Sequence, residues 1–277
     1  MFSAISNQET DTIDVSMLPK GPDLFHVQGE NSGPIQKFIK IYNMRFFILF
    51  LFIITSFYSS FAQPDYKTWD TFLKKYVSAT GDVDYKSIKA NKKSLDSIVR
   101  SFSIVTVSTT WSKNDQLAFW INAYNAFTID LIVNNYPLKS IRNLDGGKPW
   151  DVKRITIGGN KYSLNNIEND IIRPQFKDAR IHFAVNCGAK SCPPLLNAAF
   201  VAKTLDSQLE AVTKKFISNT KYQTITTTKV TLSKIFDWYA VDFGDIKTFV
   251  IKYSTTKINN NAVIIFKEYD WSLNDKK

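Results

Sequence analysis

The chain has 277 residues, of which 44% are hydrophobic, 14% aromatic and 22% charged, and its net charge is +10. This composition excludes disordered, collagen-like and disulfide-dense proteins, and two cysteines are too few for a four-cysteine zinc site. The positive charge comes mostly from lysine rather than arginine, the usual residue of base-specific contacts, so we expect no nucleic-acid partner.

A secretory signal peptide is the strongest local pattern in the sequence. Arg45 precedes an apolar run over residues 46–55, and small residues follow at Ser60 and Ala62. One positive charge, a short apolar core and small residues before a cleavage point are typical of such a peptide, here residues 44–62, with cleavage near Ala62. Because a membrane-spanning helix needs about 20 apolar residues, we expect no transmembrane anchor.

The expected signal peptide separates a short upstream segment from a long downstream one. Residues 1–43 are polar and lack a helical or strand period, so we expect translation to begin at Met44 and the upstream segment to be a mis-called extension. The alternative is a cytoplasmic tail ahead of a signal anchor. Residues 63–277 hold no fixed repeat, low-complexity block or linker, which predicts a single domain.

Cleavage of the signal peptide would place this domain outside the cytoplasm, in the periplasm or the extracellular space. A lysine-rich exported protein meets anionic envelope polymers or peptides rather than nucleic acid, so these are the partner classes that the charge allows. The alternative, which we favour, is a basic surface that only keeps the protein soluble.

The first half of the domain has the pattern of helices. Apolar residues recur at helical spacing over residues 65–78 and again over 85–104, with lysines on the other face. A third helix is expected over 112–135, capped by Ser112 and stopped by Pro137. Because this third segment is apolar nearly all round, we expect it to be buried at the centre of the domain.

The second half mixes strands with helices. In chain order the sequence predicts a hairpin over 152–164 turned at Gly158 and Gly159, a short helix over 166–172 ended by Pro174, a buried strand over 181–185, a loop over 186–194, a helix over 205–217, a strand or hairpin over 222–232, a helical segment over 236–253 and a strand over 262–266. Together these elements predict an α+β fold with a helix-rich N-terminal half, whose central buried helix packs on a small antiparallel or mixed sheet.

Both cysteines and one of the two histidines lie in a single short stretch. Cys187 follows His182 by five residues, and Cys192 follows Cys187 by five more. The other histidine is His26, which the expected cleavage would remove. His182 is therefore the imidazole that the folded domain can use, and any chemistry of the thiols is expected near it.

These residues fit three kinds of site. In the first, Cys187 is a nucleophile with His182 as its base, which requires the chain to turn near Gly188, and Cys192 is the rival nucleophile if Pro193 begins a helix. In the second, the two cysteines form a disulfide, as is common in exported proteins. The third is a metal site, which is the least favoured because one histidine and two cysteines lack a fourth ligand. We expect no metal and no cofactor.

Polar residues in two places are candidates to assist a nucleophile. Glu168 is the candidate carboxylate that orients the imidazole, although Asn165 and Glu168 also have the spacing of a capping box, which is the simpler role. Asn122 and Asn125 lie on one face of the central helix, where they either donate to an oxyanion or tie neighbouring loops to the helix. The second role is the commoner one for buried amides.

Aromatic residues are the candidates for binding. Trp120 and Tyr124 stand four residues apart on the central helix, as core residues or as a ligand platform. Two further clusters join acids to aromatics: Asp237, Trp238, Tyr239 and Asp242 in one, Asp270 and Trp271 in the other. Such clusters line sugar sites and also occur where a helix packs on a core, and a glycosidase would need two of the acids to face each other across a cleft.

Four segments of the sequence resemble the signatures of the domain-of-unknown-function family 547. They are Leu117–Ala126 (LAFWINAYNA), Ile181–Leu195 (IHFAVNCGAKSCPPL), Ile235–Phe243 (IFDWYAVDF) and Tyr269–Asn274 (YDWSLN). The likeness runs over residues 65–274, nearly the whole expected domain. The family occurs in bacterial exported proteins and in plant proteins, and no activity is established for it. The resemblance therefore implies one domain without implying a reaction.

The resemblance also points to places in the chain. It supports His182, Cys187, Glu168 and the helix that carries Asn122 and Asn125 as the site. At residue 169 the resemblance leads us to expect a histidine after the glutamate, whereas this sequence has Asn169. Without that second imidazole, the assignment of a catalytic dyad has less support.

Our sequence-based hypothesis is an exported thiol-dependent hydrolase or acyl transferase. Cys187 attacks an acyl or amide carbon, His182 takes the proton, Glu168 fixes the imidazole, and Asn122 or Asn125 stabilises the oxyanion. The alternative is a non-catalytic binding module of the cell envelope in which Cys187 and Cys192 are bridged. The two hypotheses differ in whether the ring of His182 lies within about 4 Å of a free Cys187 sulfur.

Overall fold

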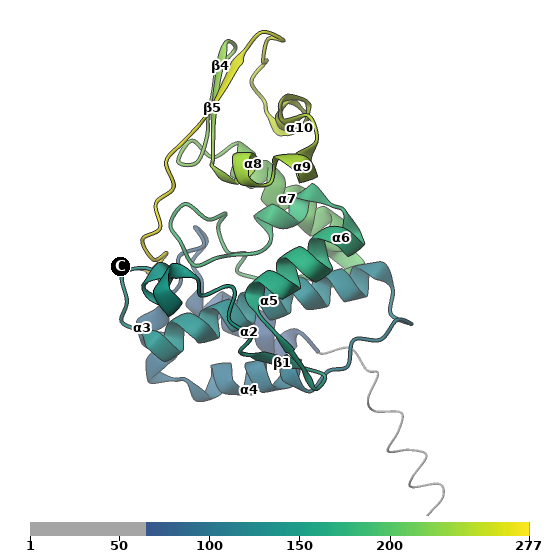
Figure 1. Cartoon of the computed structure of the whole chain (residues 1–277), viewed down its shortest axis with the longest axis vertical. Coiled ribbons are helices and arrows are strands. Elements are labelled where there is room, and N and C mark those ends of the chain that lie inside the picture. Colours follow the sequence, from purple (N-terminus) through teal and green to yellow (C-terminus); the bar gives the residue numbers. More distant parts are fainter. Residues whose placement is uncertain (1–64, 277) are drawn as a thin grey trace, which may run out of the picture. The chain divides into compact units, whose positions relative to one another are not determined.

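The fold is built around the helix α5 (Lys113–Asn135), which is buried over most of its length. A computed structural model of the chain describes residues 65–276. The Ser112 hydroxyl accepts a hydrogen bond from the N–H of Asp115 (3.1 Å) and caps the helix, and Pro137 follows its last turn. The expected central helix and its cap are therefore confirmed, and α5 is the longest helix among the described residues (Figure 1).

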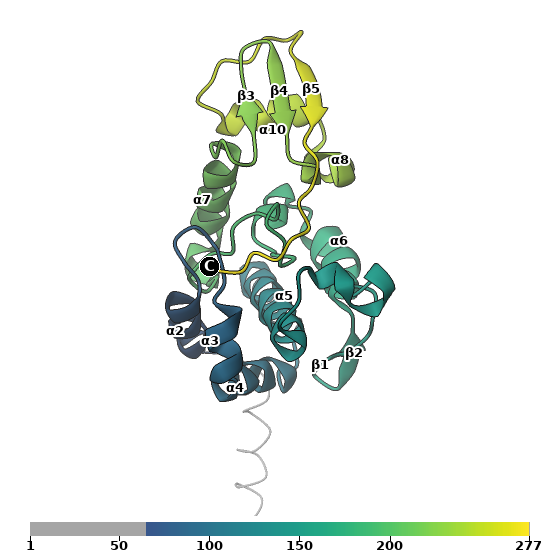
Figure 2. The ribbon, with the colours of Figure 1, turned by 90° about the vertical axis from the view of Figure 1, so that its left-hand side faces the viewer.

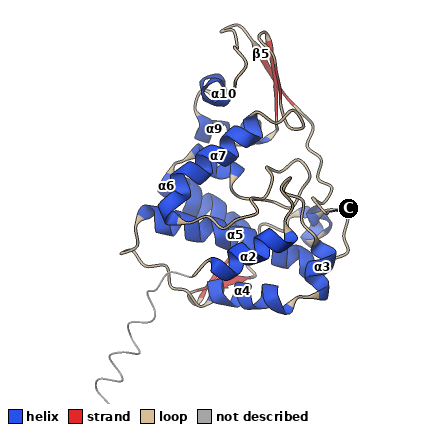
Figure 3. Cartoon of the chain, turned by 180° about the vertical axis from the view of Figure 1, so that it is seen from behind, coloured by secondary structure: helices blue, strands red, loops and turns tan. Residues whose placement is uncertain are grey.

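Among the described residues, three amphipathic helices precede α5 and pack on or beside it (Figure 3). They are α2 (Lys67–Tyr76), α3 (Tyr85–Ala90) and α4 (Lys93–Ser103). The prediction of one helix over 85–104 is wrong, because the chain leaves the helical conformation at Asn91. Asn91 favours this break, since short polar side chains compete with the helix for backbone hydrogen bonds, and its amide donates to the carbonyl of Ser87 (3.0 Å).

Within residues 65–276, two small sheets lie on different sides of the helical core. One is the hairpin of β1 (Ile155–Ile157) and β2 (Asn160–Tyr162), turned at Gly158 and Gly159 as expected. The other has the order β3 (Thr224–Ile225), β4 (Lys229–Leu232) and β5 (Val263–Phe266), with β4 antiparallel to β3 and parallel to β5 (Figure 2). The predicted single α+β domain with small antiparallel and mixed sheets is confirmed.

Helices form most of the cover of α5, and a sheet reaches it at one aromatic contact. Helices α3 and α4, the π-helix η4 (Asn166–Ile172) and the short helix η6 (Ala202–Thr204) pack on α5. The ring of Trp120 on α5 meets the ring of Tyr162 on β2 edge to face, with centroids 5.6 Å apart. The hairpin thereby closes one side of the core.

Two segments that form the site differ from the sequence-based expectation. The helix over 166–172 does not end at Pro174 but continues as α6 (Arg173–Phe176), with Pro174 in the first turn of α6. The stretch 181–185 is not a strand: it belongs largely to the 3-10 helix η5 (Ala179–Phe183). A short, wholly buried apolar run carries no period that separates strand from helix.

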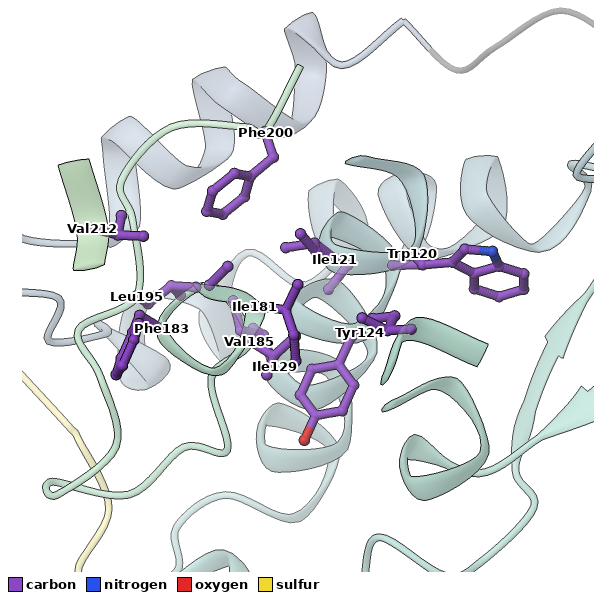
Figure 4. Close-up of a cluster of buried hydrophobic side chains, with 14 of the residues drawn as sticks. Trp120, Ile121, Tyr124, Ile129, Ile181, Phe183, Val185, Leu195, Phe200 and Val212 are labelled. Atoms are coloured by element: carbon purple, nitrogen blue, oxygen red, sulfur yellow. The ribbon is translucent and has the colours of Figure 1, made fainter. Parts of the chain in front are cut away.

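The stretch 181–185 is apolar because it packs in the hydrophobic core. Ile181, Phe183 and Val185 are buried with Tyr124 and other residues of α5 in one hydrophobic cluster (Figure 4). The carboxylate of Asp178 accepts a hydrogen bond from the N–H of Arg180 (2.9 Å) and caps η5. The burial that suggested a strand is thus the burial of a short helix against α5.

The remaining elements follow the prediction with one exception. The helix α7 (Leu205–Ile217) has the expected bounds. The helical segment expected over 236–253 is three short helices, α8 (Ile235–Trp238), α9 (Ala240–Phe243) and α10 (Ile246–Tyr253). The last break falls at Gly244, whose φ of 63° is in the left-handed region that glycine tolerates. Two further 3-10 turns are η2 (Ile141–Asn143) and η3 (Asp145–Gly147).

The expected signal peptide over 44–62 and the segment 1–43 lie outside the described residues. Within residues 65–276, no helix combines the length and the apolar character that a membrane crossing requires.

Candidate active site

A cavity of about 170 Å³ lies where several segments that are distant in sequence meet. The described residues give it side chains from α5, η4, η5, α8, the loop of residues 186–194 (the cysteine loop) and the C-terminal segment of residues 269–275. The side chains in it that can act as an acid, a base or a nucleophile are Glu168, His182, Cys187 and Cys192. Its aromatic side chains are Tyr124, Trp150, Trp238, Tyr239, Tyr269 and Trp271. The candidate nucleophile, imidazole and carboxylate therefore share one cavity.

An aspartate and an arginine hold the imidazole of His182. Nε2 of His182 lies 2.7 Å from a carboxylate oxygen of Asp242, and the ring is buried. Arg173 donates to both oxygens of the same carboxylate, from Nε (2.5 Å) and Nη2 (3.0 Å). Although burial raises the pKa of Asp242, the hydrogen bonds from Arg173 and His182 hold it below its usual range. A charged carboxylate therefore fixes the ring.

The other ring nitrogen of His182 has no hydrogen-bond partner among the described residues. This nitrogen, Nδ1, faces Oε1 of the buried Glu168 at 3.9 Å, and the ring of Tyr239 stacks on the imidazole with centroids 3.9 Å apart. Burial lowers the pKa of His182 by more than the carboxylates of Glu168 and Asp242 raise it. The ring is thus neutral near pH 7, with Nε2–H donated to Asp242 and a lone pair on Nδ1.

Glu168 owes its position to the local helix geometry. The capping bonds at the start of this helix are made by Ser163 and Asn166, each of which accepts from the N–H of the other through its side chain, at 3.0 Å. The capping box expected for Asn165 and Glu168 is absent, because Asn165 already has a helical backbone conformation (φ −62°, ψ −36°) and its side chain makes no capping bond. The carboxylate of Glu168 is directed to the cavity instead, from a π-helical segment of the kind that is frequent at functional sites.

Two asparagines fix the cysteine loop on the central helix. Asn125 of α5 accepts from the N–H of Asn186 (2.8 Å) and donates to the carbonyl of Ala184 (2.9 Å). The side chain of Asn186 in turn donates to the carbonyl of Pro193 (2.8 Å), at the far end of the loop. The loop is therefore closed on itself, and the thiols between these two points are held on the cavity wall.

The C-terminal segment runs along the cysteine loop and completes the cavity. Leu273 pairs with Ala189 in an antiparallel bridge, and the N–H of Asn274 donates to the carbonyl of Gly188 (3.0 Å). This pairing brings Tyr269 and Trp271 to the cavity from the far end of the chain.

Cys187 and Cys192 are both free thiols and lie side by side. The N–H of Cys187 donates to Sγ of Cys192 (2.9 Å), and the phenol of Tyr269 lies 3.2 Å from Sγ of Cys187. Hydrogen bonds from the thiol of Cys192 and from Tyr269 lower the pKa of Cys187 although burial opposes this shift, whereas burial raises the pKa of Cys192. Burial also raises the pKa of Tyr269, so its phenol stays protonated and can donate to a Cys187 thiolate.

We expect Tyr269→Phe to raise the pKa of the Cys187 thiol. The phenol O–H of Tyr269 stabilises the Cys187 thiolate, and the variant lacks it. The pH at which the rate of alkylation by iodoacetamide reaches half its maximum should therefore be higher in the variant. The measurement is the alkylation rate of Cys187 against pH, followed by peptide mapping of the reduced chain. Tyr253→Phe is the matched control, because that phenol bonds to Glu210 (3.1 Å) away from the cavity. An unchanged midpoint in Tyr269→Phe would contradict the assigned hydrogen bond.

Gly81 packs closely against the backbone at the end of the cysteine loop. We expect Gly81→Ala to destabilise the protein by about 2–4 kcal/mol. A Cβ on Gly81 would lie 2.6 Å from Cα of Pro194 and 2.7 Å from the nitrogen of Leu195, backbone atoms that cannot turn away. Gly159→Ala is the control, since Gly159 has nearly the same φ (81° against 85°) with open space beside it. Urea denaturation of both variants measures the difference, and equal losses would show that only backbone strain matters.

The structure brings together most of the residues predicted for the site. Glu168, His182, Cys187, Tyr124, Trp238 and Tyr239 all line the cavity. No hydrogen bond among the described residues joins Cys187 to His182, because the thiol is paired with Tyr269 and Cys192 and the ring with Asp242. The predicted hydrogen bond between sulfur and imidazole is therefore not formed. Asp242, rather than Glu168, fixes the ring.

Four residues predicted for the site lie elsewhere. Asn122 and Asn125 are tied to neighbouring loops through their amides, which is the simpler of their two predicted roles. Trp120 packs on Phe119 and Tyr162 as a core residue. Asp237 is exposed and pairs with Lys234 (2.8 Å). None of these four residues lines the cavity.

Two of the alternatives considered for the cysteines are not found in the structure. The segment after Pro193 is not helical, so no helix N-terminus lowers the pKa of Cys192. The bridged form of the cysteines is absent, since both are thiols. Within residues 65–276, no group of three or more histidine, cysteine, aspartate or glutamate side chains is arranged to hold a metal ion.

The structure adds five residues that the sequence did not place in the site. Asp242 and Trp271 belonged to the acid–aromatic clusters, which was a usable signal. Tyr269 opens the Tyr269–Asn274 segment of the family resemblance, which marked its segment without giving the residue a role. Arg173 and Trp150 had no signal, since an isolated residue far along the chain shows no pattern before the fold is known. Asn169, the position of the expected histidine, accepts from Nη1 of Arg173 (2.8 Å) and so supports the arginine that holds Asp242.

Comparisons with known proteins bear on part of the chain. Neither the curated proteins nor the solved structures gave a significant match. Residues 108–217 match the sequence model of a family described as a protein of unknown function, DUF547. The matched range contains α5, Glu168, His182 and the cysteine loop, while Asp242 and the C-terminal segment lie beyond it. Over residues 108–217, the chain is thus similar to the DUF547 family of proteins of unknown function.

Proposed function

We propose that this cavity is the active site of an exported thiol-dependent acyl hydrolase or acyl transferase. One observation carries the proposal: the cavity that holds the half-buried Cys187 thiol also holds a buried imidazole whose Nδ1 has no partner. A buried polar nitrogen is normally hydrogen-bonded, and unpartnered ones are found where a ligand or water completes the contact. Export rests on the expected signal peptide.

Cys187 is the nucleophile of this reaction. Its sulfur attacks the acyl carbon of an ester or amide and forms a thioester, while the bond from that carbon to the leaving oxygen or nitrogen breaks. The thiolate is stabilised by Tyr269 and Cys192 rather than by an adjacent imidazole. The nucleophile can therefore form without an ion pair with His182.

His182 and Glu168 move the protons. The proton lost by the thiol passes through a water in the cavity to this pair, and from the pair to the leaving group. In the second half of the reaction, water gives a proton to the pair and attacks the thioester, which releases the acid and restores Cys187. An alcohol or amine in place of water makes the same site a transferase. Asp242 and Arg173 keep the ring oriented throughout.

In this proposal the phenol of Tyr124, rather than Asn122 or Asn125, donates a hydrogen bond to the oxyanion. Its side chain lines the cavity, and its hydroxyl points away from the buried hydrophobic cluster (Figure 4). Burial raises the pKa of Tyr124 well above its usual value, so the phenol remains a donor at neutral pH.

The size and lining of the cavity limit the substrate. A volume of about 170 Å³ holds a small acyl group and one or two waters, not a long chain. Trp150, Trp238 and Trp271 form an aromatic cluster with Tyr269, in which Trp238 is partly exposed. This cluster is placed to receive the rest of the substrate by stacking.

The test is hydrolysis of p-nitrophenyl acetate followed before steady state. We expect a burst of one p-nitrophenol per chain, lost in Cys187→Ser and kept in Cys192→Ser, with turnover lower by about 10³-fold in the first variant. p-Nitrophenyl octanoate should react far more slowly than the acetate because of the small cavity. A burst that survives in Cys187→Ser would exclude this residue as the nucleophile.

The aromatic cluster also favours a second candidate, a binding module without catalysis. The rings of Trp238 and Trp271 stack at 5.7 Å and the former is 45% exposed, as in sites that bind sugars or planar groups. This candidate predicts that a ligand quenches tryptophan fluorescence equally in wild type and in Cys187→Ser, and that neither hydrolyses esters.

A further inference from the structure

The two cysteines form an asymmetric pair. Both line the cavity, and the side chain of Cys192 lies against the backbone of Cys187. The backbone holds them together, since the N–H of Cys187 donates to Sγ of Cys192 and the chain between them turns at Gly188, which has a φ of 80°. Because Sγ of Cys192 already contacts the backbone of Cys187, a disulfide with a sulfur–sulfur bond of about 2 Å needs no large movement of the chain.

The surroundings assign different roles to the two sulfurs. Cys187 is half-buried on the cavity wall and is surrounded by donors, namely the phenol of Tyr269, the thiol of Cys192 and the N–H of Ala189. Cys192 also lines the cavity but is only 5% exposed. A thiol that is stabilised as thiolate and accessible reacts with oxidants, whereas a buried neutral thiol does not. Cys187 is therefore the attacking residue and Cys192 the resolving residue.

We propose that Cys187 and Cys192 are a redox pair that reduces a small hydroperoxide and is converted to a disulfide. The Cys187 thiolate attacks one peroxide oxygen; a sulfur–oxygen bond forms, the oxygen–oxygen bond breaks, and the departing alkoxide takes up the proton that Cys187 lost on ionising. The sulfur of Cys192 then attacks the sulfenic acid on Cys187. The sulfur–oxygen bond breaks, and the hydroxide leaves as water with the proton of Cys192.

Electrons balance in this sequence. Two thiols each lose one electron, and the peroxide gains both and yields an alcohol and water. Hydrogen peroxide is small enough for a cavity of about 170 Å³, and the phenol of Tyr269, 3.2 Å from Sγ of Cys187, is placed to donate to the departing oxygen. An external dithiol returns the pair to the reduced state by exchange.

Oxidation of the pair would also stop any acyl chemistry, because the same sulfur serves both reactions. The redox proposal nevertheless does not rest on the proposed function. A chain that fails to hydrolyse esters but forms the disulfide supports the redox pair alone, and a chain that hydrolyses esters but resists peroxide supports the acyl reaction alone.

The experiment treats the full chain, reduced and freed of reductant, with one equivalent of hydrogen peroxide. We expect both thiols to disappear together in an Ellman titration, a Cys187–Cys192 disulfide in the peptide map, and a rate roughly tenfold or more above that of free cysteine. Dithiothreitol should restore both thiols. Retention of both thiols, or oxidation no faster than that of free cysteine, would overturn the proposal.

Two serine variants separate the roles of the sulfurs. In Cys192→Ser, dimedone should trap a sulfenic acid on Cys187, because no resolving thiol remains. In Cys187→Ser, Cys192 should stay reduced. Oxidation of Cys192 in that variant at the wild-type rate would contradict the assignment, as would the absence of any dimedone adduct in Cys192→Ser. Thermal unfolding of both variants, read by circular dichroism, shows that each is folded during the assay.

Discussion

His182→Gln is expected to lower acyl turnover by about 10²–10⁴-fold while leaving the alkylation rate of Cys187 close to that of the wild type. In the proposed reaction the ring transfers protons through Nδ1, which has no hydrogen-bond partner among the described residues, and it has no hydrogen bond to the thiol. A paired thiol and imidazole would behave differently, because the ring would then set the pKa of the sulfur. The two rates are measured on the same preparation, with p-nitrophenyl acetate and with iodoacetamide.

Asp237→Asn is the matched control for this variant. Asp237 stands in the same C-terminal half, is exposed, and pairs with Lys234 outside the cavity. Its replacement should change neither rate. If His182→Gln instead abolished alkylation together with turnover while remaining folded, the thiol would depend on the ring, and the direct cysteine–histidine pair expected from the sequence would be the better description.

Asn122→Ala is expected to reduce the free energy of unfolding by roughly 3–5 kcal/mol, the largest loss that we expect from a single side chain. The amide of Asn122 accepts from the indole N–H of Trp69 (3.2 Å) and the N–H of Phe200 (3.0 Å), and donates to the carbonyl of Phe200 (2.7 Å). Its removal leaves three buried polar groups without partners, each of which costs about 1–3 kcal/mol and not additively.

The control for this prediction lies on the same helix. Asn135 is exposed, and its amide donates to the carbonyl of Leu131, one turn earlier (2.8 Å). Asn135→Ala should cost less than about 1 kcal/mol, because water replaces the lost partner. Urea denaturation gives both values. A loss below about 1 kcal/mol for Asn122→Ala would show that these hydrogen bonds are not the link between α5 and the loop before α7.

Hydrophobic spacing showed which parts of the chain are helical, but it did not show where a helix is interrupted. The bounds of α7 and the cap of α5 followed directly from the sequence, because hydrophobic spacing and a capping serine act locally. The stretch 181–185 could not be assigned in this way, since all of its residues are buried and the pattern has no polar face. Asn91 and Gly244 each interrupt a helix at one residue. The spacing of hydrophobic residues does not reveal such a single-residue break.

The site was predictable in its central residues and not in their partners. His182 and Cys187 stood out because histidine and cysteine are rare in this chain and lie close together. Their actual partners, Asp242 and Tyr269, come from segments that only the fold brings near, through the short helices after β4 and the C-terminal segment beside the cysteine loop. Proximity in sequence suggested a dyad, whereas the fold gives each of the two residues separate neighbours.

The most direct measurement of the central proposal is the mass of the protein during turnover. The reduced chain is mixed with p-nitrophenyl acetate, quenched in acid within the burst and digested at low pH, where thioesters survive. We predict a single acetyl group on Cys187 and none on Cys192. An unmodified Cys187 in chains that consume the ester, with acetyl groups only on lysines, would contradict the assignment of this cavity as a thiol-dependent active site.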